Sequence, residues 1–505
     1  MQVQQNAQSS SSLQDEKQEV RELHSETYVV QTMPAVLGKR DMIITAIMAL
    51  FLLTNAVSGA AGGPVALFYL ILGAIVFFTP CVVVVIQLGV LLPNEGSLFN
   101  WTTRAINRFM GFFIGLCFWL TGVLAVTTAG SAFVTTVQGL KASWLPQPWQ
   151  QGVLILVLTA LAAFIGIQRM RTIQNFINIA FVFTMVAVLL IAAAGVAWVM
   201  TGHPSATNFG ERASWYPTPD TFFLFALITL NFIGASGPLN LAGEVRGRGT
   251  KELTNTIRQH LLIGAPIVAV LYILVTTSVL IVRGSSVGPF DGFTAVQQVF
   301  GKFPADVAVT CYLIYLIAAM LFYTYASTRL IMVAGIDGFI PIRFAGLNKN
   351  RAPALATIFH AMAVAVAVTI IYIFVPSLVV FGGSATTTTT EFYTVVAAAC
   401  TLIWTIATVF FFVDLVFLYW KDPHAFRAKR QFPLWLIWLC VVVGGAACLV
   451  TVVAILVYPW LPPSLIDPGH WGLTVGGLTL ILLVMASIVS MIASGEASYE
   501  QITET

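Results

Sequence analysis

One segment of the chain combines helix-breaking residues with polar side chains inside an otherwise apolar stretch. Residues 230–238 read Leu-Asn-Phe-Ile-Gly-Ala-Ser-Gly-Pro. Pro238 cannot donate a hydrogen bond to the carbonyl of Gly234, and Gly234 and Gly237 lower the cost of leaving the helical conformation. Backbone amides and carbonyls that are freed at such a break can hold a charged or zwitterionic ligand inside a membrane. The alternative interpretation is a simple proline kink that binds nothing.

Five ionisable residues lie within apolar stretches, where such a side chain is costly and suggests a function by default. They are Glu244, His260, Arg329, His360 and Asp414. All lie near one end of their stretch, where a long side chain can reach water. We therefore interpret Arg329 and Asp414 as parts of an inner-face ion pair or gate brace, with Pro238 and Glu244 as further structural or gating residues. The alternatives are a coupling carboxylate at Asp414 and a proton-sensing histidine.

The chain shows neither a metalloenzyme motif nor a nucleotide-binding motif. The HExxH and GxxxxGK[ST] patterns are both missing from the sequence. The six cysteines fall inside apolar stretches and lack the spacing of metal sites; they are Cys81, Cys117, Cys311, Cys400, Cys440 and Cys448. We expect no catalytic residue, no cofactor and no metal, and we predict that the protein is not an enzyme.

The composition excludes a soluble protein. Of 505 residues, 58% are hydrophobic and 9% are charged, whereas soluble domains carry roughly 25% charged residues. A membrane span needs about 20 mostly apolar residues. Twelve stretches meet this need, at 41–62, 64–92, 108–140, 151–168, 173–200, 221–245, 258–283, 305–334, 353–375, 391–420, 433–458 and 471–493. The net charge of +3 is small and spread over many loops, so nucleic acid is not an expected partner.

The loops between these stretches differ in basic residues from one side to the other. If the N-terminus is cytoplasmic, the same side receives Lys39, Arg40, Arg104, Arg108, Arg169, Arg171, Arg246, Arg248, Lys251, Arg258, Arg343, Lys349, Arg351, Lys421, Arg427, Lys429 and Arg430. The other side receives Lys141, Arg212, Arg283 and Lys302. Because cytoplasmic loops carry the excess of Lys and Arg, we predict a plasma-membrane protein with both termini in the cytoplasm.

The ends of the chain are polar. The first 37 residues are rich in Gln, Ser and Glu and lack the pattern of a signal peptide. We therefore predict a cytoplasmic, largely disordered tail at 1–37, a transmembrane domain at 38–495 and a second cytoplasmic tail at 496–505.

Three groups of residues resemble the amino acid-polyamine-organocation superfamily. The first is Ser327-Thr328-Arg329, Asp337-Gly338, Pro341, Phe344, Asn348 and Pro353. The second is the break in residues 230–238 followed by Ala242-Gly243-Glu244-Val245. The third is Gly62-Gly63-Pro64, Gln87-Leu88-Gly89, Pro93, Gly96 and Trp101. The resemblance implies an all-α fold of the leucine transporter type. Spans 1–5 (about 41–200) and 6–10 (about 221–420) would form an inverted repeat, and spans 11 and 12 (about 433–493) would be appended to it.

The resemblance also implies a substrate site where spans 1 and 6 break at mid-membrane. The family spacing places the break of span 1 at Met48, Ala49 and Leu50, which contain no glycine. Amides of Ala49 and Leu50 would meet a carboxylate, carbonyls of Leu230 and Ile233 would meet an ammonium group, and Tyr323 would cover both. The remaining residues expected at the site are Asn231, Phe232, Gly234 and Ser236.

The sequence departs from the family pattern at three positions. Where many relatives carry a glutamate, this chain has Ser236, and where some carry a lysine in span 5, it has Phe181. The expected break in span 1 lacks the usual glycines. In its glycine-poor span 1 the chain resembles the glutamate/γ-aminobutyrate antiporter branch more than the typical permeases. Without a charge at mid-membrane, the site favours a neutral or zwitterionic substrate.

These observations predict a secondary active transporter that works by alternating access. Its partners would be a small amino acid or amine, the lipid bilayer, and a coupling ion or counter-substrate that the sequence leaves open. The alternative is a channel or a transport-like membrane sensor.

The orientation can be tested with two cysteine substitutions in a background without the native thiols. We expect Thr250→Cys to be unreactive toward a membrane-impermeant thiol reagent in intact cells, because the basic-residue asymmetry places this loop inside. Ser205→Cys should react, because it lies in a loop on the other side. Labelling of Thr250→Cys without labelling of Ser205→Cys would reverse the topology.

Overall fold

The computed structural model describes residues 23–141, 143–378, 385–460 and 468–503, and this part of the chain is almost entirely helical. Eleven of its helices are long and apolar enough to cross a membrane. A pair bent by 43°, Lys39–Leu50 with Leu53–Gly62, completes a twelfth span. The predicted twelve-span, all-α architecture is confirmed, although several helices extend beyond their predicted ends.

The first five spans are α3 (Lys39–Leu50) with α4 (Leu53–Gly59) and η1 (Ala60–Gly62), α5 (Pro64–Gly73) with η2 (Ala74–Phe78) and α6 (Thr79–Leu91), α8 (Arg108–Leu140), α9 (Pro148–Gly166) and α10 (Met170–Met200). The next five are α11 (Phe223–Phe232) with η5 (Gly237–Glu244), α12 (Lys251–Val282), α14 (Lys302–Ile336), α15 (Ala354–Thr369) with η7 (Ile370–Phe374) and α16 (Val375–Ser377), and α17 (Ala385–Lys421). The last two are α19 (Leu434–Val457) and α20 (Pro468–Thr503). Shorter helices outside the spans are α2 (His24–Thr32), α7 (Ser97–Ala105), η3 (Arg212–Trp215), η4 (Pro219–Thr221), α13 (Asp291–Phe300), η6 (Ile342–Ala345) and α18 (Pro423–Ala428).

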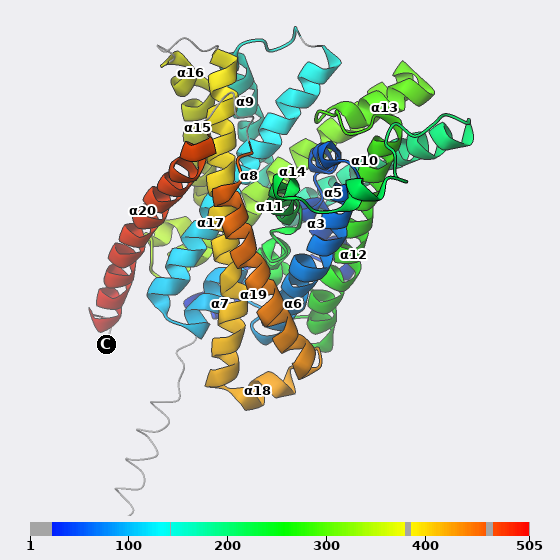
Figure 1. Ribbon diagram of the computed structural model, residues 1–505. Helices are drawn as coiled ribbons and strands as arrows, with labels where there is room; N and C mark the ends of the chain where they lie inside the picture. The colour runs from blue at the N-terminus through cyan, green and yellow to red at the C-terminus, as the bar shows by residue number, and fades with distance from the viewer. Residues whose placement is uncertain (1–22, 142, 379–384, 461–467, 504–505) are drawn as a thin grey trace, which may run out of the picture.

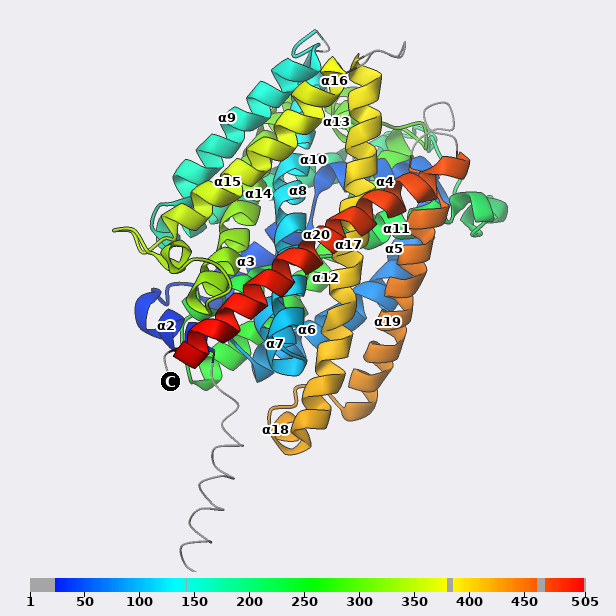
Figure 2. The same cartoon turned by 90° about the vertical axis from the view of Figure 1, so that its left-hand side faces the viewer.

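The two interrupted spans lie inside the helix bundle, whereas the appended ones lie on its outside, with α20 at an edge in Figure 1 and α19 at an edge in Figure 2. The most apolar window of Phe223–Glu244 is 89% buried, whereas that of Gly469–Gly495 is 22% buried. Helix α3 packs against α10, α12 and α14, and η5 packs against α3 and α14. Helix α20 runs obliquely across α17 and leaves most of its surface to lipid (Figure 2).

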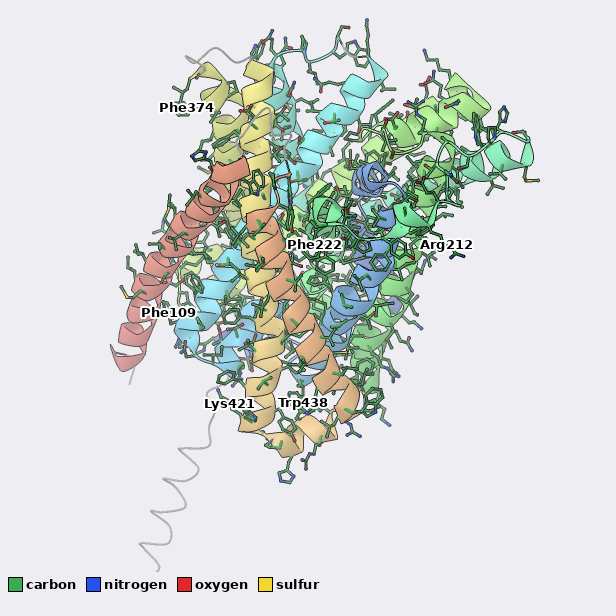
Figure 3. The ribbon with its side chains drawn as sticks, in the orientation of Figure 1. Phe109, Arg212, Phe222, Phe374, Lys421 and Trp438 are labelled. Carbon is green, nitrogen blue, oxygen red and sulfur yellow. The ribbon has the colours of Figure 1, made fainter. Side chains whose placement is uncertain are left out.

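One end of the molecule carries α2, α7, α18 and the C-terminal end of α20 (Figure 2). We call it the basic end, because the predicted cytoplasmic cations lie there; Lys421 marks it in Figure 3, with Phe374 at the opposite end. The described parts of both termini therefore lie at the same end, as an even number of spans requires.

The N-terminal region differs from the predicted disordered tail. Residues 23–37 form α2 and an extended segment that are docked on the basic end. Ser25 donates two hydrogen bonds of 2.9 Å to the carboxylate of Asp337, through its backbone N–H and its hydroxyl. Glu26 forms an ion pair of 2.6 Å with Arg104. No apolar pattern in the sequence predicts this docking, because α2 buries only Ser25 and Val29 and binds mainly through polar contacts.

The opposite tail also differs from its prediction. Helix α20 continues to Thr503, so most of the expected tail at 496–505 prolongs the last span, and residues 504–505 lie outside the described part.

Two adjacent glycines of α19 show how closely neighbouring spans approach. A Cβ atom on Gly444 would lie 2.4 Å from the ring of Phe412 in α17 and 2.7 Å from Cβ of Pro80 in α6. A Cβ atom on Gly445 would meet nothing within 4 Å. Small residues at such contacts let helix backbones approach in a membrane, where packing drives helix association.

We therefore expect Gly444→Leu to lower the unfolding free energy in detergent by about 1–3 kcal/mol, the usual cost of overpacking. The matched variant Gly445→Leu places the same side chain one residue away and should change stability by less than about 0.5 kcal/mol. Thermal unfolding of the two purified variants would measure the difference. Equal losses would contradict the packing of α19 against α17 and α6.

Candidate functional site

The first span breaks at Phe51 and Leu52, directly after the predicted position at Met48, Ala49 and Leu50. Helix α3 continues through Leu50, and Phe51 and Leu52 adopt extended conformations (φ/ψ −101°/115° and −117°/112°) before α4 begins. The amides of Ala49 and Leu50 therefore lie inside α3, where helix geometry commits them to carbonyls one turn earlier. The prediction that these two amides bind a carboxylate is corrected accordingly.

Tyrosine hydroxyls bind the backbone groups that the break in span 1 releases. Tyr272 of α12 donates to the carbonyl of Leu50 (3.0 Å) and accepts from the N–H of Leu52 (3.1 Å). Tyr323 of α14 donates to the carbonyl of Ala49 at 2.8 Å. Because each of these groups would otherwise be unpaired in the protein interior, the hydroxyls replace the helical bonds that are lost.

Two more tyrosines of α14 complete this arrangement. The hydroxyl of Tyr315 binds the carbonyls of Met48 and Phe51. The hydroxyl of Tyr312 accepts from the N–H of Thr54 (3.3 Å) and lies 3.0 Å from its hydroxyl. We call Tyr272, Tyr312, Tyr315 and Tyr323 the tyrosine cluster. It explains how span 1 can break at Phe51 and Leu52, where there is no glycine.

The break in span 6 lies where the glycines and proline predict it. Helix α11 ends at Phe232, Ile233 is extended, and Gly234 has a φ of +100° that side-chain-bearing residues rarely adopt. A Cβ atom on Gly234 would also lie 2.8 Å from the indole ring of Trp404 in α17. Pro238 stands at the start of η5, where a missing N–H costs little.

The break in span 6, unlike that in span 1, leaves polar groups without partners. Within the described part of the chain, no hydrogen bond reaches the carbonyls of Leu230, Asn231, Phe232 or Ile233. The side-chain oxygens of Asn231 and Ser236 and the indole N–H of Trp404 are also buried without a partner there. These groups remain available to a ligand.

A cavity of about 190 Å³ lies between the two breaks. On the same measure a single water needs only about 10–15 Å³, so the cavity can hold an organic molecule. Its lining from the two broken spans is Ala49, Leu50, Leu52, Asn55, Leu230 and Ile233. The remaining lining comes from α8 (Thr121, Leu124, Ala125, Thr127, Thr128, Ala129), from α12, α14 and η7 (Tyr272, Tyr315, Ala319, Tyr323, Ile371) and from α17 (Tyr393, Val396, Ala397, Cys400, Thr401, Trp404). None of these lining side chains is charged.

The structure brings together only part of the predicted substrate site. Ala49, Leu50, Leu230, Ile233 and Tyr323 line the cavity. Among the others, Met48 contributes a carbonyl to the tyrosine cluster, Phe232 stacks on Phe78 with ring centroids 4.7 Å apart, and Asn231, Gly234 and Ser236 are buried in the break beside the cavity.

The missed lining residues had a partial signal in the sequence. Tyr312, Tyr315, Ala319 and Tyr323 recur at spacings that place them on one face of a helix, so a polar stripe on α14 could have been found. Nothing in the α8 and α17 segments alone pointed to the cavity, because the fold alone brings them to it.

The predicted gating residues lie between the cavity and the basic end. Arg329 contacts Glu244 (Nη2 to Oε1, 2.6 Å) and Glu95 (Nε to Oε1, 3.3 Å), and all three side chains are buried. The sequence interpretation had named Arg329 and Glu244 but not Glu95, which lies in a loop beyond the second span.

The other buried ionisable residues stand apart from this cluster. Asp414 accepts a 2.7 Å hydrogen bond from the hydroxyl of Thr102 rather than pairing with a described cation. His260 bonds through Nδ1 to the carbonyl of Ile257 (2.6 Å), and His360 has no hydrogen-bond partner in the described part of the chain.

Two broken membrane helices around an uncharged cavity are the architecture of the leucine transporter fold. The structure of MhsT in complex with L-phenylalanine shares this fold, with a TM-score of 0.56 at 10% identity over 84% of this chain and 99% of that one. The sequence model described as amino acid permease matches residues 41–495. The chain therefore belongs to the amino acid permease family and is a transporter rather than an enzyme.

Three curated relatives are similar over part of their length. An uncharacterized transporter of Legionella pneumophila is 24% identical over 57% of this chain and 62% of its own. The probable threonine/serine transporter YbxG of Bacillus subtilis is 22% identical over 66% of this chain and 72% of its own. The lysine-specific permease LysP of Lactococcus lactis is 22% identical over 57% and 58%. The matched stretch thus spans less than two thirds of the Legionella and Lactococcus proteins.

Removing one hydroxyl of the tyrosine cluster should test its role. We expect Tyr272→Phe to lower the unfolding free energy by about 1–3 kcal/mol, because it leaves the Leu50 carbonyl and the Leu52 amide buried and unpaired. Tyr69 is the matched control, since its buried hydroxyl has no partner among the described residues. Tyr69→Phe should leave thermal stability unchanged or raise it. An equal loss of unfolding free energy in Tyr69→Phe and Tyr272→Phe would show that the tyrosine cluster does not stabilise the break in span 1.

Proposed function

We propose that the chain is a secondary active transporter that carries a neutral or zwitterionic amino acid, or a related amine, by alternating access. The observation that carries this proposal is an uncharged cavity beside unpaired backbone carbonyls. A net charge in such a site would lack a counter-charge, whereas an ammonium group can be bound by carbonyl dipoles alone. Membership of the amino acid permease family supports the class of substrate.

The two ends of the substrate would meet different walls of the cavity. Its ammonium group would bind the carbonyls at the C-terminal end of α11, near Leu230 and Ile233, where the helix dipole is negative. A carboxylate would meet the N–H donors of Asn55 and Trp404, which both line the cavity. The side chain would then face the threonines and small apolar residues of α8 and α17, so size and shape would select among substrates.

Alternating access needs one end of the site to close while the other opens. In the described structure the basic end is closed by α2 and by the buried cluster of Arg329, Glu95 and Glu244. We assign Glu244 and Arg329, with Pro238 at the start of η5, to this inner closure, and we leave Asp414 as a structural residue held by Thr102. By the basic-residue asymmetry, the basic end faces the cytoplasm of the cell whose plasma membrane holds the protein.

A channel or a transport-like sensor is the second candidate function. No geometric feature of the described residues favours either over a carrier: none of Glu95, Glu244 and Arg329 lines the cavity, and all three side chains are buried. Accumulation of a labelled solute in liposomes separates the alternatives, since a sensor moves none and a channel cannot accumulate it.

The experiment is uptake of each of the twenty standard amino acids and γ-aminobutyrate into proteoliposomes that contain the purified chain. We expect saturable uptake of at least one neutral solute. Ala397→Trp should reduce that uptake at least tenfold, because Ala397 lines the cavity from a regular part of α17 and a tryptophan would fill it. Gly234→Leu should abolish it too, because the position needs a positive φ and contacts Trp404.

The control is Gly445→Leu, whose side chain would point away from described neighbours and should leave uptake unchanged. Thermal unfolding of each variant shows that the fold is kept. Normal uptake by a folded Ala397→Trp protein would exclude this cavity as the binding site, and exclusive uptake of dicationic or dianionic solutes would exclude a neutral substrate.

A further inference from the structure

Two buried carboxylates share one guanidinium group between the cavity and the basic end. Glu244 Oε1 lies 2.6 Å from Nη2 of Arg329, and Glu95 Oε1 lies 3.3 Å from its Nε. Glu95 Oε2 accepts a 2.7 Å hydrogen bond from the N–H of Gly243. The second oxygen of Glu244 has no donor in the described part of the chain. The cluster therefore holds more negative than positive charge, and Glu95 Oε1, although it lies in ion-pair range of Arg329, also has no hydrogen-bond donor among the described residues.

The groups around the cluster restore the balance only in part. The charge of Arg248 opposes the rise in the pKa of Glu95, but its guanidinium donates to the carbonyls of Val30, Met33 and Gly243 rather than to a carboxylate. The other titratable or charged groups on the elements packed here include Tyr325 on α14, Tyr28 and the Glu26–Arg104 pair at α2, Asp337 with its neighbours His24 and Arg108, and Lys39, Arg40 and Asp41 on α3. Burial, and next the charge of Glu244, raise the pKa of Glu95, whereas Arg329 and the Gly243 N–H oppose this.

The N-terminal segment 23–37 covers the cluster from the basic end, and we call it the strap. Val29 is 2% exposed and lies so close to Gly243 that a Cβ there would be 2.3 Å from Val29 Cγ1 and 2.7 Å from Glu95 Oε2. The N–H groups of Val36 and Leu37 donate to the backbone carbonyl of Glu244, at 2.9 and 3.0 Å. Water cannot reach the carboxylates from this end while these contacts hold.

We propose that Glu95 and Glu244 bind one proton between them while the strap is closed, and that this proton passes to water at the basic end when the strap lifts. A net negative charge buried beside a single guanidinium is strongly unfavourable, and a bound proton removes it. Once water enters, both carboxylates are solvated and ionise. Proton binding and closure of the basic end are then linked, and each favours the other.

The same cluster is connected to the cavity by η5. This segment begins just beyond the break of span 6 and ends at Glu244, so a ligand that moves the break also moves one carboxylate of the pair. The link between proton release and solute movement rests on the proposed function, whereas proton binding and strap closure do not.

The test measures strap opening as a function of pH, without any substrate. In the full chain without native thiols, Val29→Cys is labelled with a maleimide in detergent, and its rate is divided by that of the exposed Thr250→Cys to remove the intrinsic pH dependence of the thiol. If one proton leaves on opening, this ratio should rise about tenfold per pH unit. The rise should begin above the pKa that the carboxylate pair has when the strap is open, and it should end at the pKa that the pair has when the strap is closed. Glu95→Gln and Glu244→Gln should each abolish the slope, because the remaining carboxylate is balanced by Arg329.

A second measurement detects the proton itself. Infrared spectroscopy of the closed protein near neutral pH should show the carbonyl stretch of a protonated carboxylic acid that Glu95→Gln and Glu244→Gln both remove and that Asp414→Asn leaves in place. The proposal is overturned if both glutamine variants keep the wild-type slope, or if neither alters the band. A chain that moves no amino acid but shows the slope and the band would refute the proposed function alone.

Discussion

The rest of the structure depends on how unpaired backbone is satisfied where span 1 breaks. A membrane helix that stops at mid-depth leaves carbonyls and amides that lipid cannot solvate, and each costs several kcal/mol. Here hydroxyls of α12 and α14 bind the carbonyls of Met48 to Phe51 and the amides of Leu52 and Thr54. The break is therefore built by neighbouring spans and not by flexible residues of its own. This ties α3 and α4 to the helices on either side of the cavity.

The two breaks consequently play different parts. At the break in span 1, tyrosine hydroxyls pair the free backbone groups, and the span presents mostly apolar side chains to the cavity. At the break in span 6, Gly234 and Pro238 interrupt the helix, and the carbonyls stay unpaired. One wall of the cavity thus presents hydrogen-bond acceptors, and the rest of its lining carries no charge. The asymmetry explains why a neutral lining is compatible with binding of a charged ammonium group.

Much of the fold could be predicted from the sequence, because membrane spans are long and apolar. The distribution of basic residues between the loops gives an independent check on the number of spans. The break at Gly234 could also be predicted, since glycine and proline lower the cost of leaving the helix without any contact to distant residues. Only family spacing predicts a break in span 1, at Met48–Leu50, whereas the break lies at Phe51 and Leu52. The tyrosines that stabilise it there are more than 200 residues away in the sequence, so no local pattern could predict its position. Glu95 and the docked α2 were missed for a related reason: polar contacts between distant segments leave no periodic pattern.

At the basic end, the buried charged cluster and the strap form one structural unit. A guanidinium between two carboxylates gains little net stability from pairing, because desolvation offsets the attraction. Such a cluster is therefore better suited to distinguish two states than to hold a fold together. Burying it under Val29 and the backbone of residues 36–37 makes its energy depend on whether the end is closed. Since η5 runs from the break in span 6 to Glu244, one short segment connects the wall of the cavity to the buried charges.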